Sequence, residues 1–253
     1  MSHLVVALIV FIVVLGSALA CSYLRDVLPQ HHLSDESISM VKLTTGLLAT
    51  LAALVLGLLI SSAKGSFDTT NGEIVHSAVD IVRLDRVLAR YGPETRDIRA
   101  QLKHITAASI ALLADGDAAQ VVRMTGPEAI ARTEEFQRQV ENLSPHNAAQ
   151  SQLQTKALQI VDEVYTTRWL ALLQEKASIP TPLLVVLVVW LGIIFGTFGL
   201  FAPRNGTTIT VLVMGALSAA GAIFMIMEMN TPLDGVVRVS LGPMRAALTI
   251  LGQ

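Results

Sequence analysis

The sequence predicts an all-α integral membrane protein, with four transmembrane helices and a helical water-soluble domain between the second and the third. Three features predict this class: a low content of charge, four long runs without charge, and one charged middle segment. Only 15% of the 253 residues are charged, against roughly 25% in soluble domains, and 52% are hydrophobic. The charge-free runs are residues 1–24, 43–63, 177–203 and 205–227.

Each run is long enough to cross a bilayer, because a helix rises ~1.5 Å per residue and ~20 residues span the hydrocarbon core. Lipid offers no hydrogen-bond partners, so each run must satisfy its backbone as a helix. We therefore expect spans at about 4–24 and 43–64, within 1–64, and at about 182–203 and 207–228, within 179–229. Residues 15–21 resemble a signal cleavage site, but no Lys or Arg precedes the apolar run, so we expect it to remain as a helix.

The middle segment, residues 65–178, contains 27 of the 38 charged residues. Its apolar residues recur at helical intervals, and Gly92-Pro93, Gly126-Pro127 and Ser144-Pro145 divide it into four helices. We expect a helical bundle whose first helix continues from the second span. Residues 230–253 are too short to span a membrane after the break at Gly242-Pro243, which leaves a tail that folds back as an interfacial or bundle-packed helix.

Small residues mark helix contacts in two of the spans. In the second span Ala49, Ala53, Gly57 and Ser61 recur every four residues on one face, and Gly192 and Gly196 do so in the third span. Such residues let membrane helices approach closely. Packing within one subunit and packing between subunits both explain the pattern. The small residues of the first span, at 16–18 and 20, have the same interpretation.

The second span also contains residue types that can line a pore. Hydroxyl groups can line an ion path, and an apolar constriction can gate it by excluding water. The pore-lining candidates are Thr45, Thr50, Leu54, Leu58 and Ser61. The alternative is that these residues only pack, because a hydroxyl in a membrane helix often bonds to its own backbone.

The sequence gives no sign of catalytic chemistry. No ionisable residue lies at mid-depth in a span, which disfavours proton pumping, and interfacial water can solvate Asp26 and Glu228 at the ends of their runs. Phosphate-binding and hydrolase motifs are absent, and we interpret His31 and His32 as solvated loop residues and Cys21 as a small buried side chain. We therefore expect no enzyme, metal or cofactor. The net charge of −2 disfavours nucleic acid as a partner.

Four spans place both termini and the middle domain on one side of the bilayer. Positive residues favour the cytoplasmic side, and the middle domain carries 12 Lys and Arg residues. We thus expect a multi-pass protein of the bacterial inner (cytoplasmic) membrane, with a cytoplasmic helical domain and both termini in the cytoplasm.

Four stretches resemble the bestrophin-like family of membrane proteins, a domain of unknown function. They are residues 64–69, 84–94, 198–205 and a tail from 228 to 243, and together the resemblance covers nearly the whole chain. The residues of interest in these stretches are Lys64, Phe67, Asp68, Asp85, Arg86, Glu228, Pro232 and Asp234. Bestrophins are pentameric anion channels with four membrane helices and a helical cytosolic domain, so the resemblance implies a homo-oligomer that conducts an inorganic ion. Bestrophins line their neck with aromatic residues, whereas residues 43–63 contain none.

Three hypotheses follow for a protein whose first partner is the lipid bilayer. The first is a homo-oligomeric channel with the second span near its axis. The second is a non-conducting scaffold whose soluble helices bind a protein that the sequence does not identify. The third is a stator component like MotA, TolQ and ExbB, which also have a large cytoplasmic segment between the second and third spans.

Overall fold

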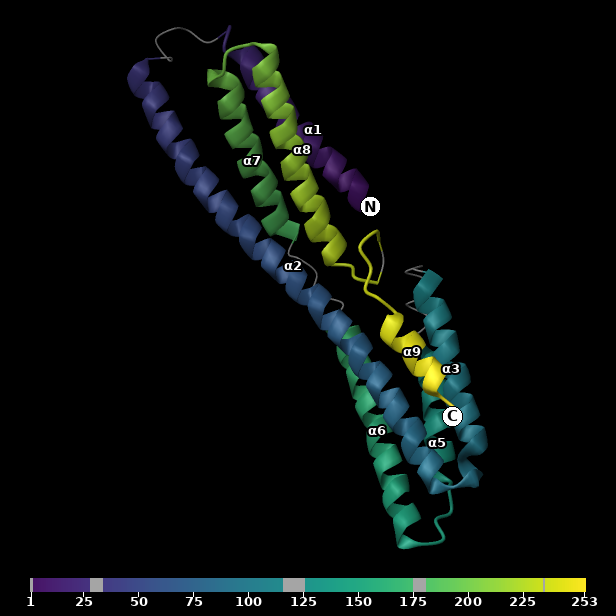
Figure 1. The fold of residues 1–253 in the computed structure, drawn as a ribbon. Helices are drawn as coiled ribbons and strands as arrows, with labels where there is room; N and C mark the ends of the chain where they lie inside the picture. The colour runs from purple at the N-terminus through teal and green to yellow at the C-terminus, as the bar shows by residue number, and fades with distance from the viewer. Residues whose placement is uncertain (1, 28–33, 116–125, 175–180, 234) are drawn as a thin grey trace. The chain divides into compact units, whose positions relative to one another are not determined.

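The computed structural model describes residues 2–27, 34–115, 126–174, 181–233 and 235–253, and within these ranges it is helical without strands (Figure 1). The expected all-α class is confirmed. The helices are α1 (His3–Leu24), α2 (Asp35–Tyr91), α3 (Arg96–Asp115), α5 (Pro127–Glu141), α6 (Ala148–Gln174), α7 (Thr181–Phe201), α8 (Gly206–Met229) and α9 (Gly242–Ile250), with a 3-10 turn at Pro93–Thr95.

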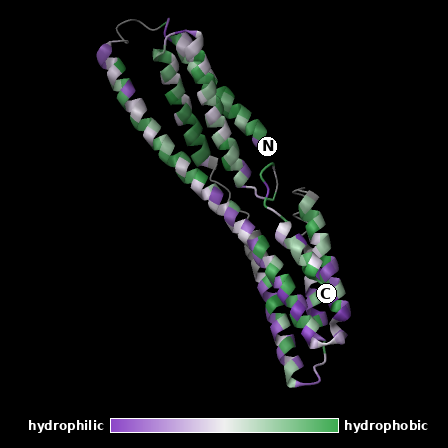
Figure 2. Cartoon of the chain, viewed as in Figure 1, coloured by the Kyte–Doolittle hydropathy of each residue, from purple (hydrophilic) through white to green (hydrophobic). Residues whose placement is uncertain are grey.

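Four of these helices are long and apolar enough to cross a membrane: α1, α2, α7 and α8. They coincide with the four predicted spans. Figure 2 shows the same division by hydropathy, with α1, α7, α8 and the first part of α2 mostly hydrophobic and the remaining helices mixed. A mixed helix has a polar face for water, whereas an apolar helix is suited to lipid.

The chain divides into two compact units, which we call the membrane unit and the helical unit. The membrane unit comprises Met1–Ser66 and Ser178–Asn230, and the helical unit comprises Phe67–Ala177 and Thr231–Gln253. Helix α2 contributes to both units without a break, as the sequence predicts.

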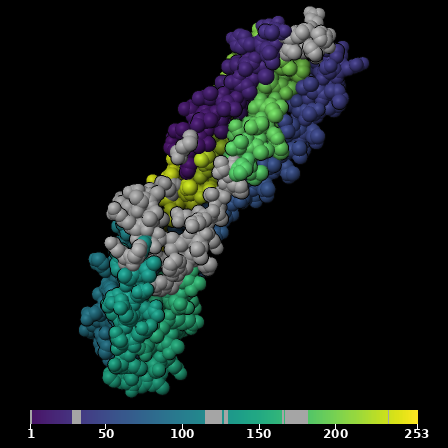
Figure 3. Space-filling model, turned by 180° about the vertical axis from the view of Figure 1, so that it is seen from behind, coloured from purple at the N-terminus to yellow at the C-terminus, as the bar shows by residue number. Residues whose placement is uncertain are grey.

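In the membrane unit, α7 lies between α1 and α2 (Figure 3). Helices α1 and α7 run in parallel, because Ser17 contacts Gly192 and Arg25 contacts Ala202, and α8 returns antiparallel. One apolar cluster joins α2, α7 and α8 through Ala52, Leu59, Ala63, Leu187, Ile194 and Ile226, and another joins α1 and α8 through Val10, Val14, Ala216, Ala220 and Ile223.

In the helical unit, the second part of α2 packs with α3, α5, α6 and α9 around one apolar core. The predicted breaks occur where glycine and proline stand: Gly92 has a φ of 148°, and α5 begins at Pro127. The tail belongs to this core, because Met244, Ala247 and Leu251 are buried in it. Of the two forms that the sequence leaves open for the tail, the structure therefore has the bundle-packed one, and not a separate interfacial segment.

Candidate functional site

The face of α2 that points away from α7 gathers four of the five pore-lining candidates. Residues four or seven positions apart share a helix face, and Thr50, Leu54, Leu58 and Ser61 follow this spacing. All four are exposed in the single chain. Leu54 is 72% exposed and Leu58 is 64% exposed. The membrane unit thus leaves one face of α2 without a helix from its own chain.

The fifth candidate, Thr45, does not share this face. It is buried, and it stands seven residues before Ala52 and fourteen before Leu59, which pack in the cluster with α7. The sequence pattern could not separate the two faces, because hydroxyl residues occur all around this part of α2. We therefore omit Thr45 from the exposed face.

The small-residue stripe on α2 divides in the same way. Ala49 packs partly against the cluster with α7, whereas Ala53 and Gly57 are exposed. A Cβ atom added to Gly57 would meet nothing within 4 Å. Close packing at Ala53 and Gly57 therefore has no partner within the described part of this chain.

The glycines of α7 have a partner within the chain, namely α1. The Ser17 hydroxyl shares its proton between the Val14 carbonyl of its own helix, at 2.8 Å, and the Gly192 carbonyl of α7, at 2.9 Å. A Cβ added to Gly196 would stand 3.1 Å from Cys21 Sγ. A third glycine, Gly199, lies so close to Ala18 that an added Cβ would overlap the Ala18 carbonyl group. Glycine is needed here because two backbones meet.

Polar contacts join the ends of these helices. Arg204, in the turn between α7 and α8, donates to the Asp26 carboxylate and to the Ser22 backbone, and its guanidinium lies 5.2 Å from the Tyr23 ring centre. Arg25 donates to the Ala202 carbonyl at 3.2 Å. Asp26 is therefore a structural partner of Arg204, in addition to its exposure to water.

Glu228 differs from the sequence-based expectation. It is only 3% exposed, and its carboxylate lies 2.9 Å from Nδ1 of His3. Interfacial water is therefore not its main partner. The sequence reasoning missed His3, because nothing in the residues near position 3 indicates that α1 and α8 bring the two side chains together.

In the helical unit Asp85, one of the residues indicated by the family resemblance, is fully buried and forms an ion pair with Arg99. Arg99 donates from Nε at 2.8 Å and from Nη2 at 3.0 Å to its two carboxylate oxygens. This hydrogen bonding raises the pKa of the Arg99 guanidinium, and burial opposes it to a smaller extent. Two parallel bonds of this kind fix both side chains.

Three cations, Arg86, Arg99 and Lys103, bind the backbone after α9. Arg86 and Arg99 both donate to the Gln253 carbonyl, at 3.3 and 3.1 Å, and Lys103 donates to the Leu251 carbonyl at 3.0 Å. Neighbouring residues of the family resemblance, Asp85 and Arg86, thus position α3 and the segment after α9. The sequence reasoning identified these two residues but not Arg99 or Lys103, which have no distinguishing local pattern.

The remaining residues of the resemblance are spread over the chain. Lys64 and Asp68 are exposed and Phe67 packs partly against the helical core, while Pro232 lines a pocket described below. Asp234 lies outside the described residues.

Within the described residues, no group of three His, Cys, Asp or Glu side chains could hold a metal ion. His31 and His32 lie outside the described ranges, and Cys21 is a free thiol beside Gly196.

Four apolar helices joined to a helical unit define a polytopic helical membrane protein. The Bestrophin-like domain family matches residues 11–244, so the chain belongs to the bestrophin-like family. Comparison with curated proteins and with solved structures gave no significant match.

Proposed function

We propose that this bestrophin-like protein is not an enzyme but a homo-oligomeric ion channel, in which copies of α2 surround the pore. The observation that supports this is the exposed face of α2. Lipid suits a leucine face, and α1 also exposes Leu4, Leu8 and Ile12. The α2 face differs from the α1 face in its exposed hydroxyls, Thr50 and Ser61. It also carries the small residues Ala53 and Gly57, which favour contact with another helix.

A closed ring of subunits would account for both the small residues and the leucines of this face. Small residues at Ala53 and Gly57 allow neighbouring copies of α2 to approach, and cyclic symmetry places the same face of every copy toward one axis. Leu54 and Leu58 then form two apolar rings, one helical turn apart, which can close the pore by excluding water.

The hydroxyl of Thr50 indicates whether such a pore would pass cations or anions. Its single proton is donated to the Gly46 carbonyl at 3.0 Å, so what remains for an ion is the lone pairs of the oxygen. Lone pairs coordinate a cation, whereas an anion needs a donor. We therefore propose that Thr50 favours an inorganic cation, in contrast to the anion selectivity of bestrophins.

The alternative is a non-conducting scaffold, which the strong apolarity of the α2 face favours. A stator-like function of the MotA, TolQ and ExbB kind has less support, since residues 43–63 contain no carboxylate that could carry protons along α2. In each case we propose that the helical unit and both termini lie in the cytoplasm and that the membrane is the bacterial inner membrane.

Assembly is tested first, with full-length protein in detergent and its mass measured by light scattering. We expect a ring of several copies, and we expect Gly57→Leu to break it while leaving the helical content of the chain unchanged. The matched control is Gly16→Leu on α1, which also has nothing within 4 Å of an added Cβ. A monomer, or equal effects of both variants, contradicts the channel.

Conduction is tested with the same protein in planar bilayers. We expect a current that Leu54→Ser increases, because a polar side chain keeps the constriction wet. The control is Leu8→Ser, a leucine on α1 that is 57% exposed. A ring without current in the wild type and in both variants favours the scaffold.

A further inference from the structure

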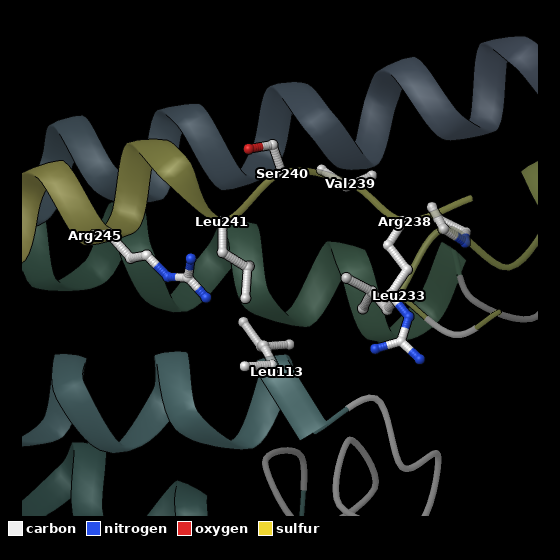
Figure 4. Close-up of a pocket in the computed structure, with 9 residues that line it drawn as sticks. Leu113, Leu233, Arg238, Val239, Ser240, Leu241 and Arg245 are labelled. Atoms are coloured by element: carbon white, nitrogen blue, oxygen red, sulfur yellow. The ribbon is translucent and has the colours of Figure 1, made fainter. Parts of the chain in front are cut away.

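A pocket of about 290 Å³ lies in the helical unit, where the segment between α8 and α9 passes the end of α3. Its walls come from Leu113 and Ala114 of α3, from residues 232–233 and 238–241 of the connecting segment, and from Arg245 of α9 (Figure 4). The proposed channel does not use this pocket.

The lining combines two cations with an apolar wall. Leu113, Leu233, Val239 and Leu241 supply the apolar part, and Figure 4 shows the side chains of Leu113 and Leu241 pointing toward each other. Arg238 and Arg245 supply the charge, and no Asp or Glu is among the described residues that line the pocket. The described lining residues therefore carry two positive charges and no negative charge.

The two arginines differ in how they are held. Arg238 donates from Nε to the Gly235 carbonyl at 2.7 Å, which orients its guanidinium and leaves its terminal nitrogens for another acceptor. Arg245 stands in the first turn of α9, where its backbone N–H donates to the Leu241 carbonyl at 3.0 Å, and its guanidinium makes no hydrogen bond or ion pair with another described residue. A guanidinium binds carboxylate and phosphate through two parallel hydrogen bonds.

From this combination we propose that the pocket binds a phosphate group, with Arg238 and Arg245 as its ligands. The volume of about 290 Å³ has room for a phosphate group together with part of the molecule that carries it. The phosphate belongs to an anionic lipid headgroup or to a soluble phosphate compound. The apolar wall suits the glycerol part of a lipid, and Pro232 follows the last residue of the fourth span by three positions in the sequence.

The test uses full-length protein in detergent and measures the shift of its unfolding temperature on adding a probe. The probes are short-chain phosphatidylglycerol, short-chain phosphatidylcholine and inorganic phosphate. We expect phosphatidylglycerol to raise the unfolding temperature. Phosphatidylcholine should have no effect, because its choline cation neutralises the phosphate and is repelled by the two arginines. If inorganic phosphate raises the unfolding temperature as much as phosphatidylglycerol does, the pocket binds soluble phosphates. A response to phosphatidylglycerol alone assigns the pocket to lipid, and either outcome supports phosphate binding.

Variants connect the response to the pocket. Arg245→Gln and Arg238→Gln should each weaken the apparent affinity for the probe by about tenfold or more, because each removes a charge-assisted pair of hydrogen bonds. Arg245→Lys keeps the charge but not the planar fork, so it should lie between the wild type and Arg245→Gln. Both arginines are exposed, so we expect these variants to fold, which circular dichroism without the probe verifies.

The matched control is Arg96→Gln, an exposed arginine of α3 outside the pocket, which changes the net charge equally. An equal loss of affinity in Arg96→Gln shows a general effect of charge and overturns the proposal. Equal responses to phosphatidylglycerol and phosphatidylcholine overturn it too, as does the absence of any response to phosphatidylglycerol and to inorganic phosphate.

Discussion

At the scale of single residues, the helical unit depends on groups that are buried and must be satisfied. Asp85 is 0% exposed and its only described charged partner is Arg99. A carboxylate in this position is costly when it loses its partner, because its desolvation is no longer offset. The pair fixes where α3 lies against α2, and Arg99 then holds the Gln253 carbonyl.

Replacement of Arg99 by alanine should therefore destabilise the helical unit strongly, because it leaves the buried Asp85 carboxylate without its partner. We expect a loss of about 3–5 kcal/mol in the free energy of unfolding, measured by chemical denaturation of the full chain in detergent. The control is Asp80→Ala, which removes an exposed pair with Arg83 and should cost less than about 1 kcal/mol. Similar losses in both variants would contradict the special role of Asp85.

Tyr91 differs from Asp85 because its buried polar group, the hydroxyl, has no hydrogen-bond partner among the described residues. We expect Tyr91→Phe to leave the fold unchanged and to raise the free energy of unfolding by about 1–3 kcal/mol, because a desolvated and unpaired hydroxyl is removed. Tyr91→Leu, which removes the ring, is the control and should destabilise the chain. A loss of stability in Tyr91→Phe would reveal a hydroxyl partner.

At the scale of elements, the contact between α1 and α7 depends on the absence of side chains. An added Cβ at Gly199 would stand 2.7 Å from the Ala18 carbonyl carbon, and backbone cannot move aside as a flexible side chain does. The Ser17 hydroxyl strengthens the same contact by bonding across to the Gly192 carbonyl. Helices α1 and α7 therefore form a fixed pair.

Gly199→Ala tests this pair. In an isolated helix, alanine would stabilise by about 1 kcal/mol relative to glycine. Here we expect the reverse, a destabilisation of the membrane unit, seen as faster proteolysis and a lower unfolding temperature in detergent. Gly16→Ala is the control, because its Cβ meets nothing within 4 Å and only the gain in helix propensity remains. Stabilisation by both variants would show that α1 and α7 can separate without cost.

The packing of the tail around α9 can also be tested by substitution. Leu251, which follows it, is 0% exposed in the core of the helical unit. We expect Leu251→Ala to lower the free energy of unfolding by about 2–5 kcal/mol, in the range of buried leucines, as measured by denaturation. Val236→Ala, at an exposed position in the same tail, should change it by less than about 0.5 kcal/mol. Equal effects would mean that the tail is not part of the core.

At the scale of the whole molecule, an even number of spans decides which parts share a side of the membrane. If all four apolar helices cross, residues before α1, the helical unit and residues after α8 face the same compartment. The segment that connects α1 to α2 and the turn at Arg204 face the other. The positive charge in the helical unit supports our proposal that the first group lies in the cytoplasm.

Reporter fusions measure this topology. We expect alkaline phosphatase fused after Gln253 to be inactive, and the same enzyme fused after Asn205 to be active, because it functions only outside the cytoplasm. A fluorescent protein that folds only in the cytoplasm should give the reverse pattern at the two positions. An active alkaline phosphatase after Gln253 would invert the topology.

The sequence by itself determined the all-α class, the four apolar helices, the continuous α2 and the breaks at Gly92 and Pro127. These features depend on local composition, on helical period and on residues that terminate helices, so they can be derived from neighbours in the chain. Only the tertiary structure decided which face of α2 stays exposed, that Thr45 is on the other face, and that His3 meets Glu228 and Arg99 meets Asp85. It also decided that the tail packs in the core. Such contacts join residues far apart in the chain, and packing in three dimensions selects them among many that the sequence permits equally well.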